Sequence, residues 1–155
     1  MGKEAMPLDK TGQNRETEVW QRVNGCCPPE GGDIRPLLLA AAETLGAYRQ
    51  LAQLLTGGKR ERMKGLLAVS RRSLEGLRGI QRMSGYPAEK LRTAAIPGES
   101  ARRLLERSYH RALRQMTEYT ARMLDPDYGT VFRTLADRER DAAVVLAELI
   151  GGLEE

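Results

Sequence analysis

The chain has 155 residues and a formal net charge of +4, and 41% of its residues are hydrophobic. This length supports one domain with its own core, and the scarcity of aromatic residues beside abundant Leu, Ala, Glu and Arg favours helix over sheet. No run of about 18 apolar residues is present, which excludes a transmembrane helix, and Met1–Lys10 lacks the apolar run of a secretory signal. Arginines interleaved with Glu indicate a solvated, ion-paired surface. We therefore expect a cytoplasmic protein that contacts neither membranes nor nucleic acid.

Residues 1–33 are predicted to form a polar arm with one short amphipathic segment around Trp20. We expect Trp20 to pack on the outside of the following domain, with docking onto another subunit or a partner as the alternative. Cys26 and Cys27 are adjacent and are the only cysteines. A rubredoxin-type iron centre or a zinc ribbon needs four spaced thiolates and is therefore excluded. The pair is typical of ordinary thiols in a reducing compartment.

Residues 34–155 are predicted to form four helices, at about Arg35–Leu55, Lys59–Met83, Glu99–Leu124 and from the break at 125–129 to Ile150. Pro36 suits a first helical turn. Glycine pairs at 57–58 and 151–152 are predicted to end the first and fourth helices. The short connection before Lys59 predicts that the first two helices are antiparallel neighbours.

The connection from Ser84 to Gly98 is long and contains two prolines. About 15 residues can span roughly 50 Å, whereas a helix of about 25 residues is roughly 37 Å long. The chain can therefore cross the length of the bundle and start the third helix parallel to the second. An up-down-up-down bundle with a loose loop is the competing topology.

Each predicted helix has an apolar seam at steps of three and four residues. Near the middle of the seams, polar Ser70, Ser73 and Glu139 replace leucine-type residues, and Ala41, Ala112 and Ala142 are expected at similar depth. Gly76 and Gly79 are expected to permit close helix approach. The residues predicted to be buried together are Leu38, Leu45, Leu66, Leu77, Ile80, Leu105, Met116, Phe132, Leu135, Leu146 and Leu149.

Three stretches carry a resemblance to a known family. They are Leu45-x-x-Tyr48-x-x-Leu51, the run LEGLRGI at 74–80, and DPDYG-x-VF-x-x-LA-x-x-E at 125–139. Over about residues 35–151 the chain resembles the ferritin-like superfamily, and within it the small bacterial rubrerythrin-like proteins. The resemblance implies an all-α, ferritin-like four-helix bundle with a long crossover between the second and third helices.

In that family the first and third helices each supply a Glu to a di-iron site, and the second and fourth each supply Glu-x-x-His. Carried over onto this sequence, the six ligand positions are Ala41, Ser70, Ser73, Ala112, Glu139 and Ala142. One potential ligand remains, and the single histidine of the chain, His110, rules out two histidine ligands. One carboxylate and two hydroxyls do not suffice to hold two iron ions.

The leading hypothesis is a non-catalytic bundle without a cofactor that acts as a structural or interaction protein. It is expected to form a homodimer or to bind an unknown protein partner. The first alternative is an oxidoreductase with an altered iron or manganese centre. Its candidate ligands are Glu43, Glu106, His110 and Glu139, although Glu43 is expected on a flanking face and His110 is expected to pair with Glu106. The second alternative is a small-molecule site in the vacated centre, lined by Tyr48 and Tyr109.

Glu139 itself is predicted to be buried and to find a hydroxyl or arginine partner, because a carboxylate in an apolar interior must be paired or protonated.

Overall fold

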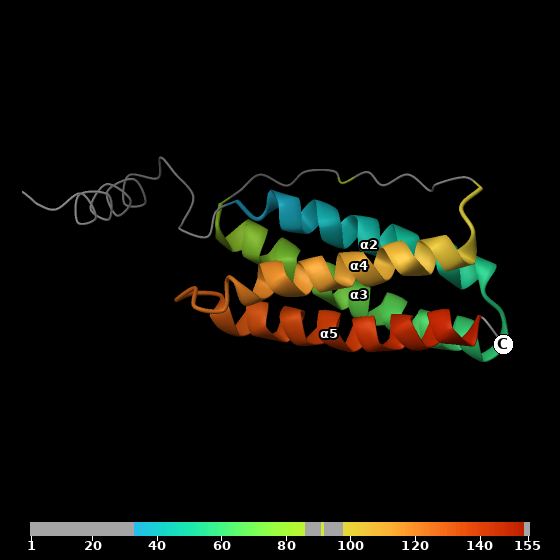
Figure 1. Ribbon diagram of the computed structural model, residues 1–155. Coiled ribbons are helices and arrows are strands. Elements are labelled where there is room, and N and C mark those ends of the chain that lie inside the picture. The colour runs from blue at the N-terminus through green and yellow to red at the C-terminus, as the bar shows by residue number, and fades with distance from the viewer. Residues whose placement is uncertain (1–32, 86–90, 92–97, 154–155) are drawn as a thin grey trace, which may run out of the picture. The chain divides into compact units, whose positions relative to one another are not determined.

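The computed structural model describes residues 33–85, 91 and 98–153, which contain four helices and no strand. The helices are α2 (Arg35–Leu54), α3 (Gly57–Met83), α4 (Ala101–Thr120) and α5 (Gly129–Gly152) (Figure 1). This confirms the all-α fold class. The chain divides into two compact units, Met1–Asp33 and Ile34–Glu155. The predictions for the arm, Trp20, Cys26 and Cys27 lie outside the described residues.

The helix boundaries differ from the predicted ones at the glycine pairs. Gly57 does not end the first helix but begins α3, with a φ of 59°, and α5 continues through Gly152. Glycine permits a helix to end but does not require it, and buried Leu149 holds the last turn of α5 against the core. Pro36 lies in the first turn of α2, as predicted. None of the described helices combines the length and apolarity needed to cross a bilayer.

The turn between α4 and α5 is held by the sequence DPDYG. The Asp125 carboxylate accepts the backbone N–H groups of Asp127 and Tyr128, each at 2.8 Å, which is the usual reason for Asp in a turn. Gly129 follows because a Cβ at this position would collide with the carbonyl oxygen of Met123. This turn allows α5 to reverse immediately against α4.

The four helices form a square in cross-section. α2 packs against α3 and α4, and α5 packs against α3 and α4, so that α2 lies diagonally opposite α5. The start of α2 shares one core cluster with the ends of α3 and α4 and the start of α5. α3 and α4 therefore run in the same direction, opposite to α2 and α5 (Figure 1).

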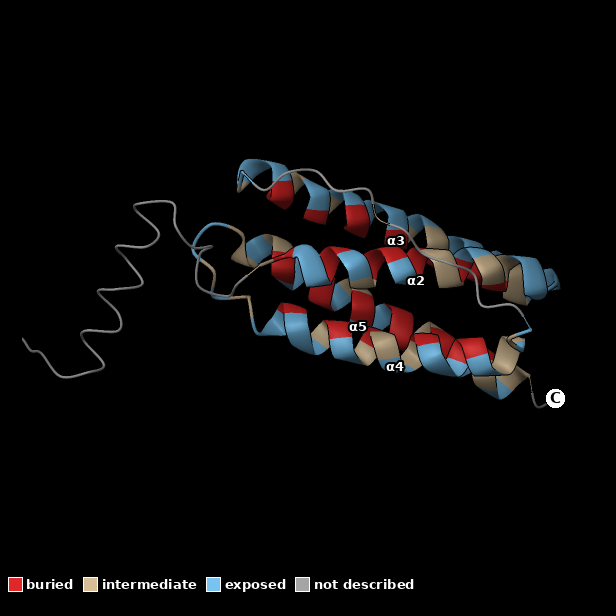
Figure 2. Cartoon of the chain, turned by 90° about the horizontal axis from the view of Figure 1, so that it is seen from above, coloured by how far each residue is buried: buried red, intermediate tan, exposed pale blue. Residues whose placement is uncertain are grey.

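The buried faces of all four helices point inward (Figure 2), and the core consists of two apolar clusters. Of the residues predicted to be buried together, all are buried except Met116, which is partly exposed. On α4 the inward face is shifted by one residue, so that Ser108 and Gln115 are buried where Tyr109 and Met116 were expected. The polar side chain of Gln115 can be buried because its amide group has hydrogen-bond partners inside the bundle.

The glycines of α3 do not mediate close helix packing. An added Cβ at Gly76 would meet nothing within 4 Å, and one at Gly79 would meet only the flexible end of the Arg82 side chain. The prediction of a close helix approach at these residues is therefore wrong.

Truncating the core should destabilise the bundle strongly. Leu77 and Leu135 are 0% and 1% exposed, so Leu77→Ala or Leu135→Ala should lower the free energy of unfolding by about 2–5 kcal/mol. Met83→Ala is the matched control, because Met83 is 69% exposed and its loss should cost less than about 0.5 kcal/mol. Urea denaturation measures all three. Losses below about 1 kcal/mol at both leucines would contradict the assigned core.

Two glycine substitutions should have opposite effects. Gly76→Ala should stabilise the protein by about 0.5–1 kcal/mol, because Ala has the higher helix propensity and the space is open. Gly129→Ala should destabilise it, because the new Cβ would push against the Met123 backbone. Thermal melts of the two variants provide the comparison, and a stabilising Gly129→Ala would show that the turn is not tightly packed.

Candidate functional site

A layer of polar side chains separates the two apolar clusters. On α3, α4 and α5 its residues lie between the members of one cluster and the members of the other, and on α2 Thr44 lies beside Leu45, the last residue of this helix in the first cluster. All of these side chains are buried. We call the polar layer the set Thr44, Ser70, Ser73, Gln115 and Glu139.

The contact between α2 and α4 fixes the register of these two helices. The Thr44 hydroxyl donates to the Gln115 side-chain oxygen at 2.9 Å. In an antiparallel pair, each residue forward on one helix matches one residue back on the other. Tyr48 on α2 therefore lies at the level of Arg111 and its neighbour Ala112 on α4.

The register of α5 follows in the same way. The Tyr119 ring stacks on Phe132 with centroids 6.4 Å apart, which places Ala112 level with Glu139. On the other side of α5, Arg138 donates to the Ser73 hydroxyl at 3.3 Å. Tyr48, Ala112 and Glu139 thus lie at one level of the bundle, and Ser73 lies within reach of Arg138, the neighbour of Glu139.

One half of the layer is hydrogen-bonded. The Thr44 hydroxyl has two acceptors in reach, the Gln115 side chain and the backbone carbonyl of Ala40 at 3.0 Å. The Gln115 amide in turn donates to the Tyr119 hydroxyl at 3.4 Å. This chain of side chains links α2 and α4 and satisfies the polar atoms that it buries.

Glu139 in the layer and three buried polar groups outside it have unsatisfied atoms. Glu139 is 7% exposed and Tyr48 is 2% exposed. Within the described part of the chain, neither Glu139 Oε1 nor the Tyr48 hydroxyl has a hydrogen-bond partner. The same holds for Ser108 Oγ and Arg111 Nη1. The predicted hydroxyl or arginine partner of Glu139 is therefore missing at Oε1. Arg138, the arginine next to it in the chain, donates to the Ser73 hydroxyl.

Burial dominates the electrostatics of this layer. It raises the pKa of Glu139 from 4.5 to about 7, because a carboxylate loses its hydration in the bundle interior. The pKa of Tyr48 is raised by its own burial and then by the nearby Glu139 charge, and the same two causes raise the pKa of Tyr119. Burial also lowers the pKa of Arg111, an effect that the charge of Glu43 opposes.

The six positions carried over from the di-iron pattern are all buried. The sequence predicts a similar depth for the three alanines, but the six positions do not lie at one depth in the bundle. Ala41 belongs to the cluster at the start of α2, whereas Ala112 and Ala142 belong to the other cluster. The reason is the register of α2, which brings Tyr48 and not Ala41 to the level of Ala112.

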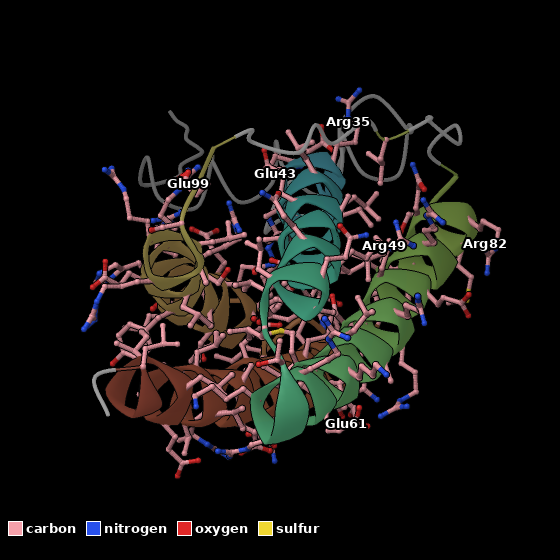
Figure 3. The ribbon with its side chains drawn as sticks, turned by 90° about the vertical axis from the view of Figure 1, so that its right-hand side faces the viewer. Arg35, Glu43, Arg49, Glu61, Arg82 and Glu99 are labelled. Atoms are coloured by element: carbon pink, nitrogen blue, oxygen red, sulfur yellow. The ribbon has the colours of Figure 1, made fainter. Side chains whose placement is uncertain are left out.

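The candidate ligands of an altered centre are not brought together. Glu139 is buried, whereas Glu43, Glu106 and His110 are exposed. Glu43 lies on the outside of α2 (Figure 3), where its charge acts on Arg111. Glu106 is 4.0 Å from Arg102, and the His110 ring meets the Tyr109 ring edge-on at 5.5 Å. The expected pairing of His110 with Glu106 does not form.

These residues do not form a set of ligands for a metal ion. In the described ranges, no three His, Cys, Asp or Glu residues lie close enough together to hold one ion. The polar layer itself offers one carboxylate, two serine hydroxyls, a threonine and an amide, which are too few anionic donors for two iron ions. The residues present do not fit a di-iron centre.

Sequence reasoning missed Thr44, Gln115, Ser108 and Arg111. A signal for Gln115 was available, since it lies three residues after Ala112 and four before Tyr119, which is the spacing of one helix face. Its polarity argued against an inward position, and only the hydrogen bonds to Thr44 and Tyr119 explain its burial.

No protein-family model, characterised protein or solved structure matches the chain. The described residues define an all-α four-helix protein whose core is divided by a buried polar layer.

Replacing Glu139 by Gln should change how stability depends on pH. A carboxyl whose pKa rises on folding contributes full stability below its unfolded pKa of 4.5, and this contribution is lost as pH rises through the folded value of about 7. At about pH 8, Glu139→Gln should be more stable than the wild type by about 3 kcal/mol, and at about pH 4 the two should be nearly equal.

Asp141→Asn is the control for this measurement, since Asp141 is exposed on the same helix. Urea denaturation at the two pH values should show no comparable gain for it. A Glu139→Gln variant that is less stable than the wild type at about pH 8 would mean that the carboxylate is charged and paired.

Proposed function

We propose that this chain is a ferritin-like, rubrerythrin-like bundle that has lost its di-iron centre and acts as a non-catalytic structural or interaction protein. The main support for this proposal is that all six ligand positions are buried, although five of them hold Ala or Ser. The parallel direction of α3 and α4 supports the long crossover of this fold class. The sequence stretches at 45–51, 74–80 and 125–139 support the family.

An altered iron or manganese centre is the weaker candidate. It would need Glu43, Glu106 and His110 to approach Glu139, but the first three are exposed and the fourth is buried. A rearrangement of whole helices would be required to join them. The non-catalytic proposal requires no such change.

An interaction role would use the outer side of α3. Arg71, Arg72, Arg78 and Arg82 are exposed there, with Glu75 as the acidic residue among them (Arg82 in Figure 3). None of these four arginines forms an ion pair with the described residues, whereas Arg103 and Arg107 on α4 both pair with Glu99. We infer an acidic protein segment as the partner, since four exposed arginines without an ion pair among the described residues give this side of α3 a positive charge.

Metal content tests the loss of the di-iron centre. Protein purified from iron- and manganese-rich medium should contain far less than one metal ion per chain, and added iron or manganese should leave its unfolding temperature unchanged. Two metal ions per chain would contradict the proposal.

A restored variant sharpens this test. Ser70→Glu, Ser73→His and Ala142→His together rebuild two Glu-x-x-His pairs with Glu139 on α3 and α5. If the ligand positions are assigned correctly, this variant should bind a divalent metal that the wild type does not bind. A folded variant without metal would show that the carried-over positions are wrong.

Binding to an acidic peptide tests the interaction surface. Poly-glutamate should bind the full chain in a salt-sensitive manner, and Arg71→Glu with Arg78→Glu should weaken this binding at least about tenfold. Arg103→Glu is the matched control, because its guanidinium already faces Glu99, and it should have a smaller effect. Equal weakening by both variants, or tighter binding to duplex DNA than to poly-glutamate, would contradict the assigned surface or partner.

A further inference from the structure

Two unsatisfied polar groups, Tyr48 and Glu139 of the polar layer, lie at one level of the bundle. Tyr48 reaches inward from α2 and Glu139 from α5, and these two helices are diagonal neighbours without direct packing. Both side chains are buried, and neither the Tyr48 hydroxyl nor Glu139 Oε1 has a hydrogen-bond partner among the described residues. The two groups nevertheless interact electrostatically. They therefore face the same region without touching.

The side chains near these groups on the other two helices are small. Ala112 on α4 is level with Glu139, and Ser73 on α3 contacts Arg138, the neighbour of Glu139. Leu77 and Leu105 occupy the corresponding faces of these helices in the apolar clusters. A Leu in place of Ala112 or Ser73 would bring more methyl groups toward the centre of the bundle.

A third unsatisfied donor lies beside them. Arg111 is at the level of Tyr48 by the register of α2 and α4, and its charge acts on the Tyr48 hydroxyl. Its Nη1 atom is buried and has no hydrogen-bond partner in the described ranges. Buried polar atoms that the protein leaves unpaired are commonly satisfied by ordered water, which makes about three hydrogen bonds when enclosed.

We propose that the centre of the bundle is a binding site for one internal water molecule that bridges Tyr48 and Glu139. The water accepts a hydrogen bond from the Tyr48 hydroxyl and donates one to Glu139 Oε1. Arg111 Nη1 is the third partner. The site explains why the chain keeps a carboxylate in this layer: α2, α4 and α5 meet through a water-mediated polar contact between Tyr48, Arg111 and Glu139.

The three partners match the hydrogen bonds that one enclosed water molecule makes. They are one acceptor and two donors on three different helices, with Tyr48 and Glu139 at opposite corners of the square. The proposal therefore goes beyond the structural role argued above and does not depend on the family assignment.

A high-resolution crystal structure of the full chain tests the site directly. It should show one ordered water within about 2.6–3.2 Å of both the Tyr48 hydroxyl and a Glu139 oxygen. In solution, the same water should give nuclear Overhauser effects to neighbouring backbone amides. A direct Tyr48–Glu139 hydrogen bond, an empty gap, or density for a larger molecule would overturn the proposal.

Two phenylalanine variants provide the matched comparison. Tyr48→Phe removes one partner of the water and should abolish its density and its Overhauser effects. Tyr119→Phe also removes a buried hydroxyl, but one that accepts from Gln115, and it should leave the water in place. Should Tyr48→Phe not fold, the wild-type measurement alone decides. Persistence of the water in Tyr48→Phe at full occupancy would show that the hydroxyl does not hold it.

Discussion

The central level of the bundle is arranged around a carboxyl group that is buried without a counter-charge among the described residues. Glu139 lies between the two apolar clusters of the core, and burial brings its pKa to about 7. A fully apolar layer would be the more stable choice, since replacing buried polar groups by well-packed apolar ones often stabilises a protein. The bundle keeps Glu139 and arranges small or polar residues around it, which shapes the whole central level.

The two apolar clusters hold the four helices together on both sides of the polar layer. One cluster includes Leu38, Leu77 and Leu135, and the other includes Leu51, Leu105 and Leu146. Because each cluster contains residues of all four helices, the square is held on both sides of the polar layer. The turn at Asp125–Gly129 adds a fixed reversal between α4 and α5. The polar layer is thus supported from both ends and contributes specificity of register, through Thr44 and Gln115, more than stability.

Much of this fold could be predicted from the sequence, because its helices have regular apolar seams. The inward positions of Leu77, Ile80 and Leu135 follow from the spacing alone, and so does the burial of Glu139. The inward position of Gln115 on α4 was missed although its spacing allowed it, because Met116 is more apolar and the hydrogen bond from Thr44 that accounts for the burial of Gln115 is a tertiary contact. The partner of Glu139 was also mispredicted, since helical spacing places residues on a face but does not fix the side-chain rotamers that decide whether two polar atoms meet.

The protonation state of Glu139 tests the central claim most directly. Carbon-13 labelling of the glutamate side chains allows the carboxyl resonance of Glu139 to be followed by NMR through a pH titration, with Glu139→Gln identifying the signal. The account predicts a pKa near 7 for this group, well above the ordinary value of 4.5. A pKa at or below about 4.5 would show that Glu139 is solvated or charge-paired, and would contradict a bundle built around a neutral, buried carboxyl.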